Sequence, residues 1–101
     1  MSTKRIKLVV AYDGTDFRGW AAQPGQRTVH STLTDAVRRV SGERIEITGA
    51  SRTDSGAHAK GQVCHFDTDV PIPAERWAYA LNKVLPRDLS VVRSSACPAA
   101  F

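Results

Sequence analysis

The sequence predicts an α+β domain with its elements in the order β-α-β-β-α-β, and two patterns favour that fold class. Apolar residues alternate with polar ones in several short runs, as in half-buried strands, and recur every three or four residues in two longer runs, as in amphipathic helices. Glycine and proline lie between these runs, where turns and loops are expected. With 101 residues, of which 42% are hydrophobic and 24% charged, the chain has the composition of one small globular domain.

The first strand is predicted at residues 5–13, where Ile6, Leu8 and Val10 share one side and β-branched residues are frequent. The stretch GTDFRGWAAQPGQRT contains three glycines and a proline, so we expect a long loop there. Long loops in compact domains usually carry function.

A helix is expected after this loop, because Thr28 can cap its first turn and Gly42 can end it. Its apolar stripe consists of Val29, Leu33, Ala36, Val37 and Val40. Arg38 and Arg39 lie off this stripe and are therefore expected to be exposed.

The second half of the chain predicts two strands, a helix and a last strand. Residues 45–48 alternate between apolar and polar, and GQVCHF at 61–66 predicts a third strand. Residues 74–85 predict a helix that Pro86 ends, with an apolar face of Trp77, Ala80, Leu81 and Val84. A strand at 89–93 completes the order. This is the order of the ferredoxin-like fold, an antiparallel sheet with both helices on one face.

The basic charge points to nucleic acid as a partner. The formal charge is +4, and ten of the fourteen basic residues are arginine, whose planar guanidinium group suits phosphate. An RNA-recognition module has this same order of elements and binds RNA through aromatic residues on its central strands. Lys60-Gly61 begins like the signature of its third strand, but Gln62 and Cys64 stand where the first two aromatic residues belong. Such a module, without catalysis, is the alternative function.

The cysteines and histidines predict neither a disulfide nor a metal site. Cys64 and Cys97 form no CxxC pair, so we expect both to be reduced and the protein to be cytoplasmic. Cys64 and His65 are adjacent on a strand, so they point to opposite faces and cannot converge on one ion. No segment approaches the roughly 20 apolar residues that a membrane helix needs.

The strongest candidate for chemistry is the segment GASRTDSGAHAKGQVCHFDT at residues 49–68, in which Arg52, Thr53, Asp54, Ser55 and Gly56 are consecutive. Such a run fits an ordinary turn, in which aspartate and serine bind nearby backbone amides and glycine takes a positive φ. It also fits an active site, in which the arginine keeps the carboxylate ionised and nucleophilic. The spacing by itself permits both interpretations.

This segment closely resembles the signature of the TruA family of transfer-RNA pseudouridine synthases, an Arg-Thr-Asp-x-Gly-Val-His-Ala run that carries the catalytic aspartate. Two further motifs follow the family in the same order. Residues 12–20, YDGTDFRGW, are similar to its first motif, and Thr28-Val29 to the start of its first helix. Ala80-Leu81-Asn82 with Leu85-Pro86 is similar to its second-helix motif.

The resemblance implies a role for each residue of the run. Asp54 would be the nucleophile and form a transient covalent adduct with the ribose or the base of a uridine in the anticodon stem and loop of tRNA. Arg52 would help to position this nucleotide, which must leave its stack, and Thr53, Gly56 and His58 would also bind the substrate. No cofactor is implied, because the isomerisation is redox-neutral and involves no net hydrolysis.

The resemblance also implies an RNA surface and a longer protein. The residues expected to contact RNA are Arg18, Trp20, Arg27, Arg38, Arg39 and Lys60. For Arg38 and Arg39, a solvated helix face is the alternative. Family members are homodimers and have a second, similar domain, whose tyrosine stacks on the target base. Because this chain stops at Phe101, where the family continues, we expect it to be an N-terminal half that is inactive alone.

Overall fold

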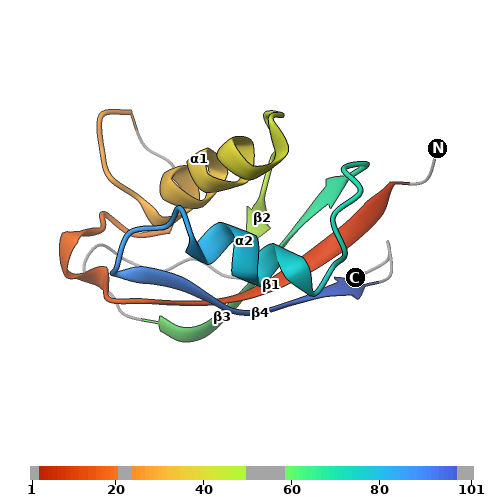
Figure 1. Ribbon diagram of the computed structural model, residues 1–101. Coiled ribbons are helices and arrows are strands. Elements are labelled where there is room, and N and C mark those ends of the chain that lie inside the picture. The colour runs from red at the N-terminus through yellow and green to blue at the C-terminus, as the bar shows by residue number, and fades with distance from the viewer. Residues whose placement is uncertain (1–2, 21–23, 50–58, 98–101) are drawn as a thin grey trace.

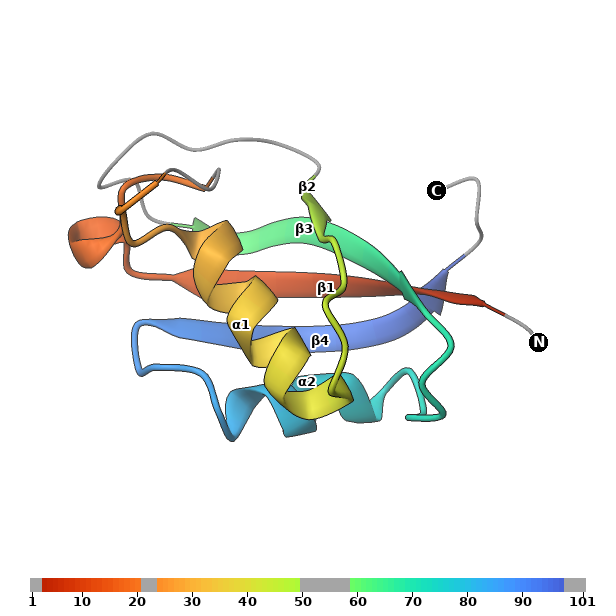
Figure 2. The ribbon, with the colours of Figure 1, turned by 90° about the horizontal axis from the view of Figure 1, so that it is seen from above.

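The computed structural model describes residues 3–20, 24–49 and 59–97, with residues 59 and 60 described by their backbone alone. It confirms the predicted α+β fold. The elements follow as β1 (Lys4–Tyr12), the short 3-10 helix η1 (Gly14–Asp16), α1 (Val29–Ser41), β2 (Thr48–Gly49), β3 (Ala59–Thr68), α2 (Arg76–Asn82) and β4 (Leu89–Cys97). The sheet order is β2-β3-β1-β4, with every neighbouring pair antiparallel. Both helices cover the same face of the sheet (Figures 1 and 2).

β1 lies at the centre of the sheet and confirms the predicted alternation. Ile6, Leu8 and Val10 are fully buried in the core between sheet and helices. Both neighbours of β1 extend beyond the predicted 61–66 and 89–93, because β1 offers backbone partners along its whole length. The predicted lengths of β3 and β4 were therefore too short, because the polar residues at their ends interrupt the apolar alternation.

α1 begins and ends where the sequence predicts. The Thr28 hydroxyl accepts a hydrogen bond from the Ser31 amide, and the Ser31 hydroxyl accepts one from the Thr28 amide, both at 3.2 Å. Gly42 adopts a left-handed φ of 76° and donates its amide to the Arg38 carbonyl at 2.8 Å. Val29, Leu33, Ala36 and Val37 of the predicted stripe are buried, and Val40 is partly buried.

The second strand is shorter than predicted and begins later. Of the predicted 45–48, Thr48 alone lies in β2, where it pairs with His65, and Gly49 extends the strand opposite Cys64. Ile45 and Ile47 are nevertheless buried. The alternation of apolar and polar residues therefore predicted correctly which side chains face the core, but not which residues form strand hydrogen bonds.

α2 is also shorter than the predicted 74–85, because turns flank it on both sides. Its docking to β4 depends on two polar side chains. The Ser94 hydroxyl accepts from the Ala78 amide at 2.9 Å and donates to the Ala74 carbonyl at 2.6 Å. The Asn82 side chain exchanges two hydrogen bonds with the backbone of Val91, at 2.9 and 2.8 Å. Among the described residues, no helix is long and apolar enough to cross a membrane.

Candidate functional site

The predicted catalytic segment connects β2 to β3. Its candidate residues, Arg52, Thr53, Asp54, Gly56 and His58, lie outside the described residues, as does the side chain of Lys60. The structure does describe both ends of the connection, Gly49 in β2 and Ala59 in β3. The site is therefore built from the elements that hold these two ends.

The second end, Ala59, enters the sheet opposite Tyr12, the last residue of β1. Tyr12 also pairs with Leu89, the first residue of β4, so three strand ends meet here. The register of β1 shifts at this end against both neighbours, as is frequent beside functional sites. The Tyr12 hydroxyl donates to the side-chain oxygen of Gln62, and both side chains are buried. This hydrogen bond ties β1 to β3 close to the point where the connection returns to the sheet.

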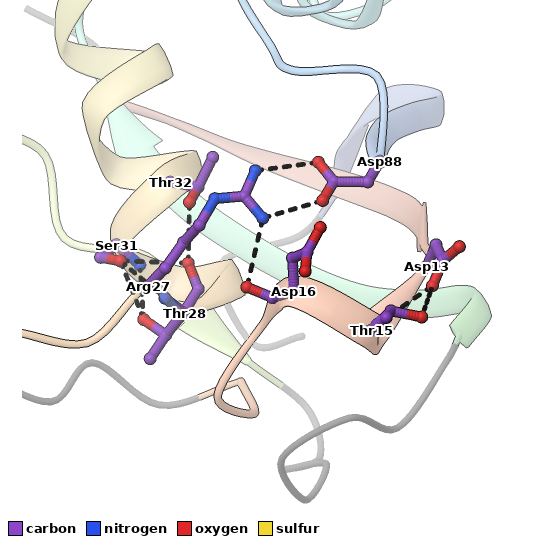
Figure 3. Close-up of polar contacts among 8 residues, drawn as sticks. All are labelled: Asp13, Thr15, Asp16, Arg27, Thr28, Ser31, Thr32 and Asp88. Atoms are coloured by element: carbon purple, nitrogen blue, oxygen red, sulfur yellow. Dashed lines mark hydrogen bonds and ion pairs between the residues drawn. The ribbon is translucent and has the colours of Figure 1, made fainter.

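The loop predicted from the first motif follows β1 directly and is anchored at the same end. The Asp13 carboxylate accepts from the amide of Thr15 at 3.0 Å and from its hydroxyl at 2.6 Å, which starts η1 (Figure 3). The Asp13 amide donates to the carbonyl of Asp88, just before β4, at 3.0 Å. The aspartate of the motif thus has a structural function in the turn.

Arg27 closes the other end of this loop (Figure 3). Its two terminal nitrogens lie 2.8 and 2.9 Å from the two carboxylate oxygens of Asp88, and one of them lies 3.4 Å from the Asp16 carbonyl. Its guanidinium carbon lies 4.1 Å from the centre of the Phe17 ring, which meets Tyr12 edge to face. The hydrogen bonds from Arg27 lower the pKa of Asp88 below its usual value. These contacts show that Arg27 supports the loop.

Trp20 was expected to contact RNA, but it is 4% exposed and leaves no ring face for a base. Its indole covers the backbone of Gly49, because a Cβ atom placed on Gly49 would lie 2.5 Å from the indole nitrogen. The tryptophan of the first motif therefore packs against the first end of the candidate connection.

His30 joins the same contact, although sequence reasoning assigned it no function. Its Nε2 lies 2.8 Å from the Ile47 carbonyl, and its amide donates to the Trp20 carbonyl at 2.9 Å. The rings of His30 and Trp20 meet edge to face, with centres 6.0 Å apart. The signal in the sequence was weak, since a histidine in the first turn of a helix has many other uses.

The remaining arginines of the predicted RNA surface are exposed. Arg18 lies in the loop, and Arg38 and Arg39 lie on the outer side of α1. Arg39 has one loose contact with Asp35 at 3.9 Å, and both side chains are largely exposed. Arg38 lines a hollow of about 430 Å³ together with Arg44, which the sequence reasoning had missed. Arg44 lies two residues after Gly42, the C-cap of α1. Its closeness to Arg38 and Arg39 in the sequence was the signal that could have added it to the predicted RNA surface.

The open face of the sheet does not support the alternative of an RNA-recognition module. That module needs exposed aromatic side chains on its central strands. Gln62 and Cys64, which occupy the places of the first two, are buried in the core. Seven described side chains of β1 and β3 lie on the face of the sheet away from the helices, and none of them is a phenylalanine, tyrosine or tryptophan. They are Arg5, Lys7, Val9, Ala11, Val63, His65 and Asp67. The predicted opposite orientation of Cys64 and His65 is confirmed, and burial raises the pKa of the Cys64 thiol to about 12.

Comparison with known proteins decides the family. A family model described as tRNA pseudouridine synthase matches residues 8–101. The chain belongs to this family. The match includes all three motifs on which the resemblance was based, so the predicted family is confirmed.

Relatives in the synthase family are considerably longer than this chain. The tRNA pseudouridine synthase A of Bacillus pumilus is 46% identical over 99 residues, which are 96% of this chain and 40% of the relative. The enzyme of the same name from Halalkalibacterium halodurans is 48% identical over 97% of this chain and 38% of its own length. That of Bacillus subtilis is 48% identical over 96% of this chain and 40% of its own length. The chain thus spans about 40% of the length of these relatives.

Proposed function

We propose that the protein is a tRNA pseudouridine synthase that isomerises uridine in the anticodon stem and loop, with Asp54 as its nucleophile. The observation that carries this proposal is the family match across residues 8–101, which includes the Arg52-Thr53-Asp54 run of the family signature. The run lies between two strands whose described ends are held by side chains from three other parts of the chain.

The proposed reaction exchanges one bond of the nucleoside for another. The bond between ribose C1′ and base N1 breaks, a bond between C1′ and C5 forms, N1 gains a proton and C5 loses one, so substrate and product are isomers. The Asp54 carboxylate forms the transient adduct with ribose or base, and Arg52 keeps it ionised and helps to hold the nucleotide. Thr53, Gly56 and His58 complete the binding of the uridine, which must first leave its stack.

The described scaffold suits such a reaction because it restricts the ends of the catalytic connection. A nucleophile must be held within about 0.5 Å of its productive position, so the strands on either side of it must not slide. The buried bond between Tyr12 and Gln62 restrains β3, and the packing of Trp20 on Gly49 restrains β2.

We further propose that Arg18, Arg38, Arg39 and Arg44 contact phosphates of the tRNA, with Lys60 beside the catalytic connection. The four arginines are exposed, and among the described residues none of them has a two-point ion pair like that of Arg27. The protein in its natural length would act as a homodimer in the cytoplasm. The residues 1–101 alone would have no detectable turnover, because a stacking group and water-excluding walls are expected from the further length that the relatives have.

The decisive experiment uses the protein in its natural length with unmodified tRNA. We expect Asp54→Asn to abolish pseudouridine formation, since the amide is a poor nucleophile, while tRNA binding persists. Asp69→Asn is the matched control, because this exposed aspartate bonds to Thr3 near the opposite end of β1 and β3. If Asp54→Asn makes pseudouridine at the rate of the unaltered protein, the proposed nucleophile is wrong.

A further inference from the structure

β2 has little support from the sheet itself. It contributes two residues to the ladder, Thr48 opposite His65 and Gly49 opposite Cys64. A two-residue strand at the edge of a sheet can shift or separate more readily than the long strands beside it. The position of Gly49, the last described residue before the catalytic connection, must therefore depend on contacts from outside the sheet.

Those contacts form what we call the Gly49 clamp, consisting of Trp20, His30, Ile47 and Gly49. The indole of Trp20 covers Gly49 so closely that a Cβ atom there would lie 2.5, 2.6 and 2.8 Å from three of its atoms. His30 holds the Ile47 carbonyl through its side chain at 2.8 Å and the Trp20 carbonyl through its amide at 2.9 Å. The clamp thus joins the loop after β1, the first turn of α1 and the chain that enters β2.

Within the described part of the chain, the His30 ring has one hydrogen bond, which joins it to the Ile47 carbonyl. A carbonyl accepts hydrogen bonds, so the Nε2 atom beside Ile47 carries a proton and donates it. The other ring nitrogen, Nδ1, is buried and has no hydrogen-bond partner among the described residues. The described contacts that hold the ring are therefore its hydrogen bond to Ile47 and its edge-to-face contact with Trp20.

We propose that Trp20 and His30 are positioning residues of the proposed reaction, which hold Gly49 and so set the point from which residues 50–58, with Asp54, leave β2. This inference rests on the proposed function, because it gives the clamp a purpose in catalysis. It goes beyond that function by giving Trp20 and His30 a positioning role through their contacts with Gly49 and Ile47.

Two substitutions of His30 test the proposal. In His30→Gln the amide nitrogen can occupy the place of Nε2 and still donate to Ile47, whereas in His30→Asn the amide is shorter and reaches the place of Nδ1. Both variants remove the ring, so the difference between them isolates the hydrogen bond. In the natural-length protein we expect His30→Asn to lower kcat by roughly tenfold to a hundredfold with KM for tRNA changed less than twofold. His30→Gln should restore most of kcat.

A readout without catalysis keeps this test separate from the proposed function. Hydrogen exchange, measured by mass spectrometry on a peptide covering residues 45–49, should accelerate about tenfold or more in His30→Asn and little in His30→Gln. If exchange accelerates but kcat does not fall, the clamp serves stability alone and the proposal is overturned. If the two variants do not differ in exchange, the bond to Ile47 does not hold Gly49, and the proposal fails as well. Full activity of Asp54→Asn would instead refute the proposed function. The exchange result would still show whether the His30 hydrogen bond holds residues 45–49 in place.

Discussion

Arg27 and Asp88, 61 residues apart in the chain, form a two-point ion pair in which each terminal guanidinium nitrogen meets its own carboxylate oxygen, at 2.8 and 2.9 Å. The pair joins the end of the first-motif loop to the turn before β4 (Figure 3). Because Arg27 also covers Phe17, it combines an ion pair with a cation–π contact.

Arg27→Gln should lower the free energy of unfolding by about 1 kcal/mol at neutral pH, since both partners are partly exposed and the ion pair is screened. The difference from the unaltered protein should be fully present above the unfolded pKa of Asp88, about 4, and should shrink as pH falls through its lowered folded pKa. Urea denaturation at a series of pH values measures this. Arg39→Gln is the control, because its loose pair with Asp35 should contribute less than about 0.5 kcal/mol. Equal losses in the two variants would contradict the assignment.

Gly49→Ala should destabilise the fold by about 1–3 kcal/mol, because the new methyl group would overlap the indole of Trp20. Gly61→Ala is the matched control in the neighbouring strand, since its Cβ atom would lie at an ordinary 3.8 Å from Val9. We expect that control to be neutral or slightly stabilising through the unfolded state. Thermal denaturation of both variants, with the indole NMR signal of Trp20, checks the prediction. An unchanged melting temperature and signal in Gly49→Ala would show that Trp20 does not pack there.

Two threonines, Thr28 at the N-cap of α1 and Thr34 in the middle of the helix, should respond oppositely to substitution by valine. Thr28→Val removes the cap of α1 and should cost about 1–2 kcal/mol, because the Ser31 amide loses its acceptor. Thr34→Val should be neutral or stabilising by up to about 1 kcal/mol, because its buried hydroxyl has no partner among the described residues. Chemical denaturation of the two variants gives the comparison. A loss of more than about 1 kcal/mol in Thr34→Val would mean that its hydroxyl does make a bond in solution.

The arginines of the proposed RNA surface should act through phosphate. Replacing Arg38 and Arg44 together by glutamine should reduce the slope of log K against log salt for tRNA binding by about two units, one for each contact. Arg76→Gln, in an exposed position of α2, is the single-charge control and should leave the slope nearly unchanged. Filter binding at four or five salt concentrations is sufficient. If the slope of the double variant equals that of the control, Arg38 and Arg44 do not belong to the proposed RNA surface.

The order of the elements and the family were predictable from the sequence, which also carries the run with the proposed nucleophile. Element order, the alternation in β1, the cap at Thr28 and the stop at Gly42 were all predictable, because each depends on residues close together in the chain. The family was equally accessible, since its motifs are local runs such as Arg52-Thr53-Asp54.

The contacts of the loop residues could not be predicted from the sequence, because they depend on tertiary packing. Trp20 stands between glycine and alanine in a polar loop and looked exposed, but its burial depends on Gly49 and His30, which are distant in sequence. The ion pair of Arg27 depends on Asp88, which lies 61 residues further along the chain. The length of β2 likewise depended on where the chain joins the edge of β3, since β3 continues to Thr68 but β2 pairs with His65 and Cys64. Short-range patterns record which residues prefer burial or a given backbone shape, whereas the partner that buries or neutralises a side chain is set by long-range packing, which no local run of residues encodes.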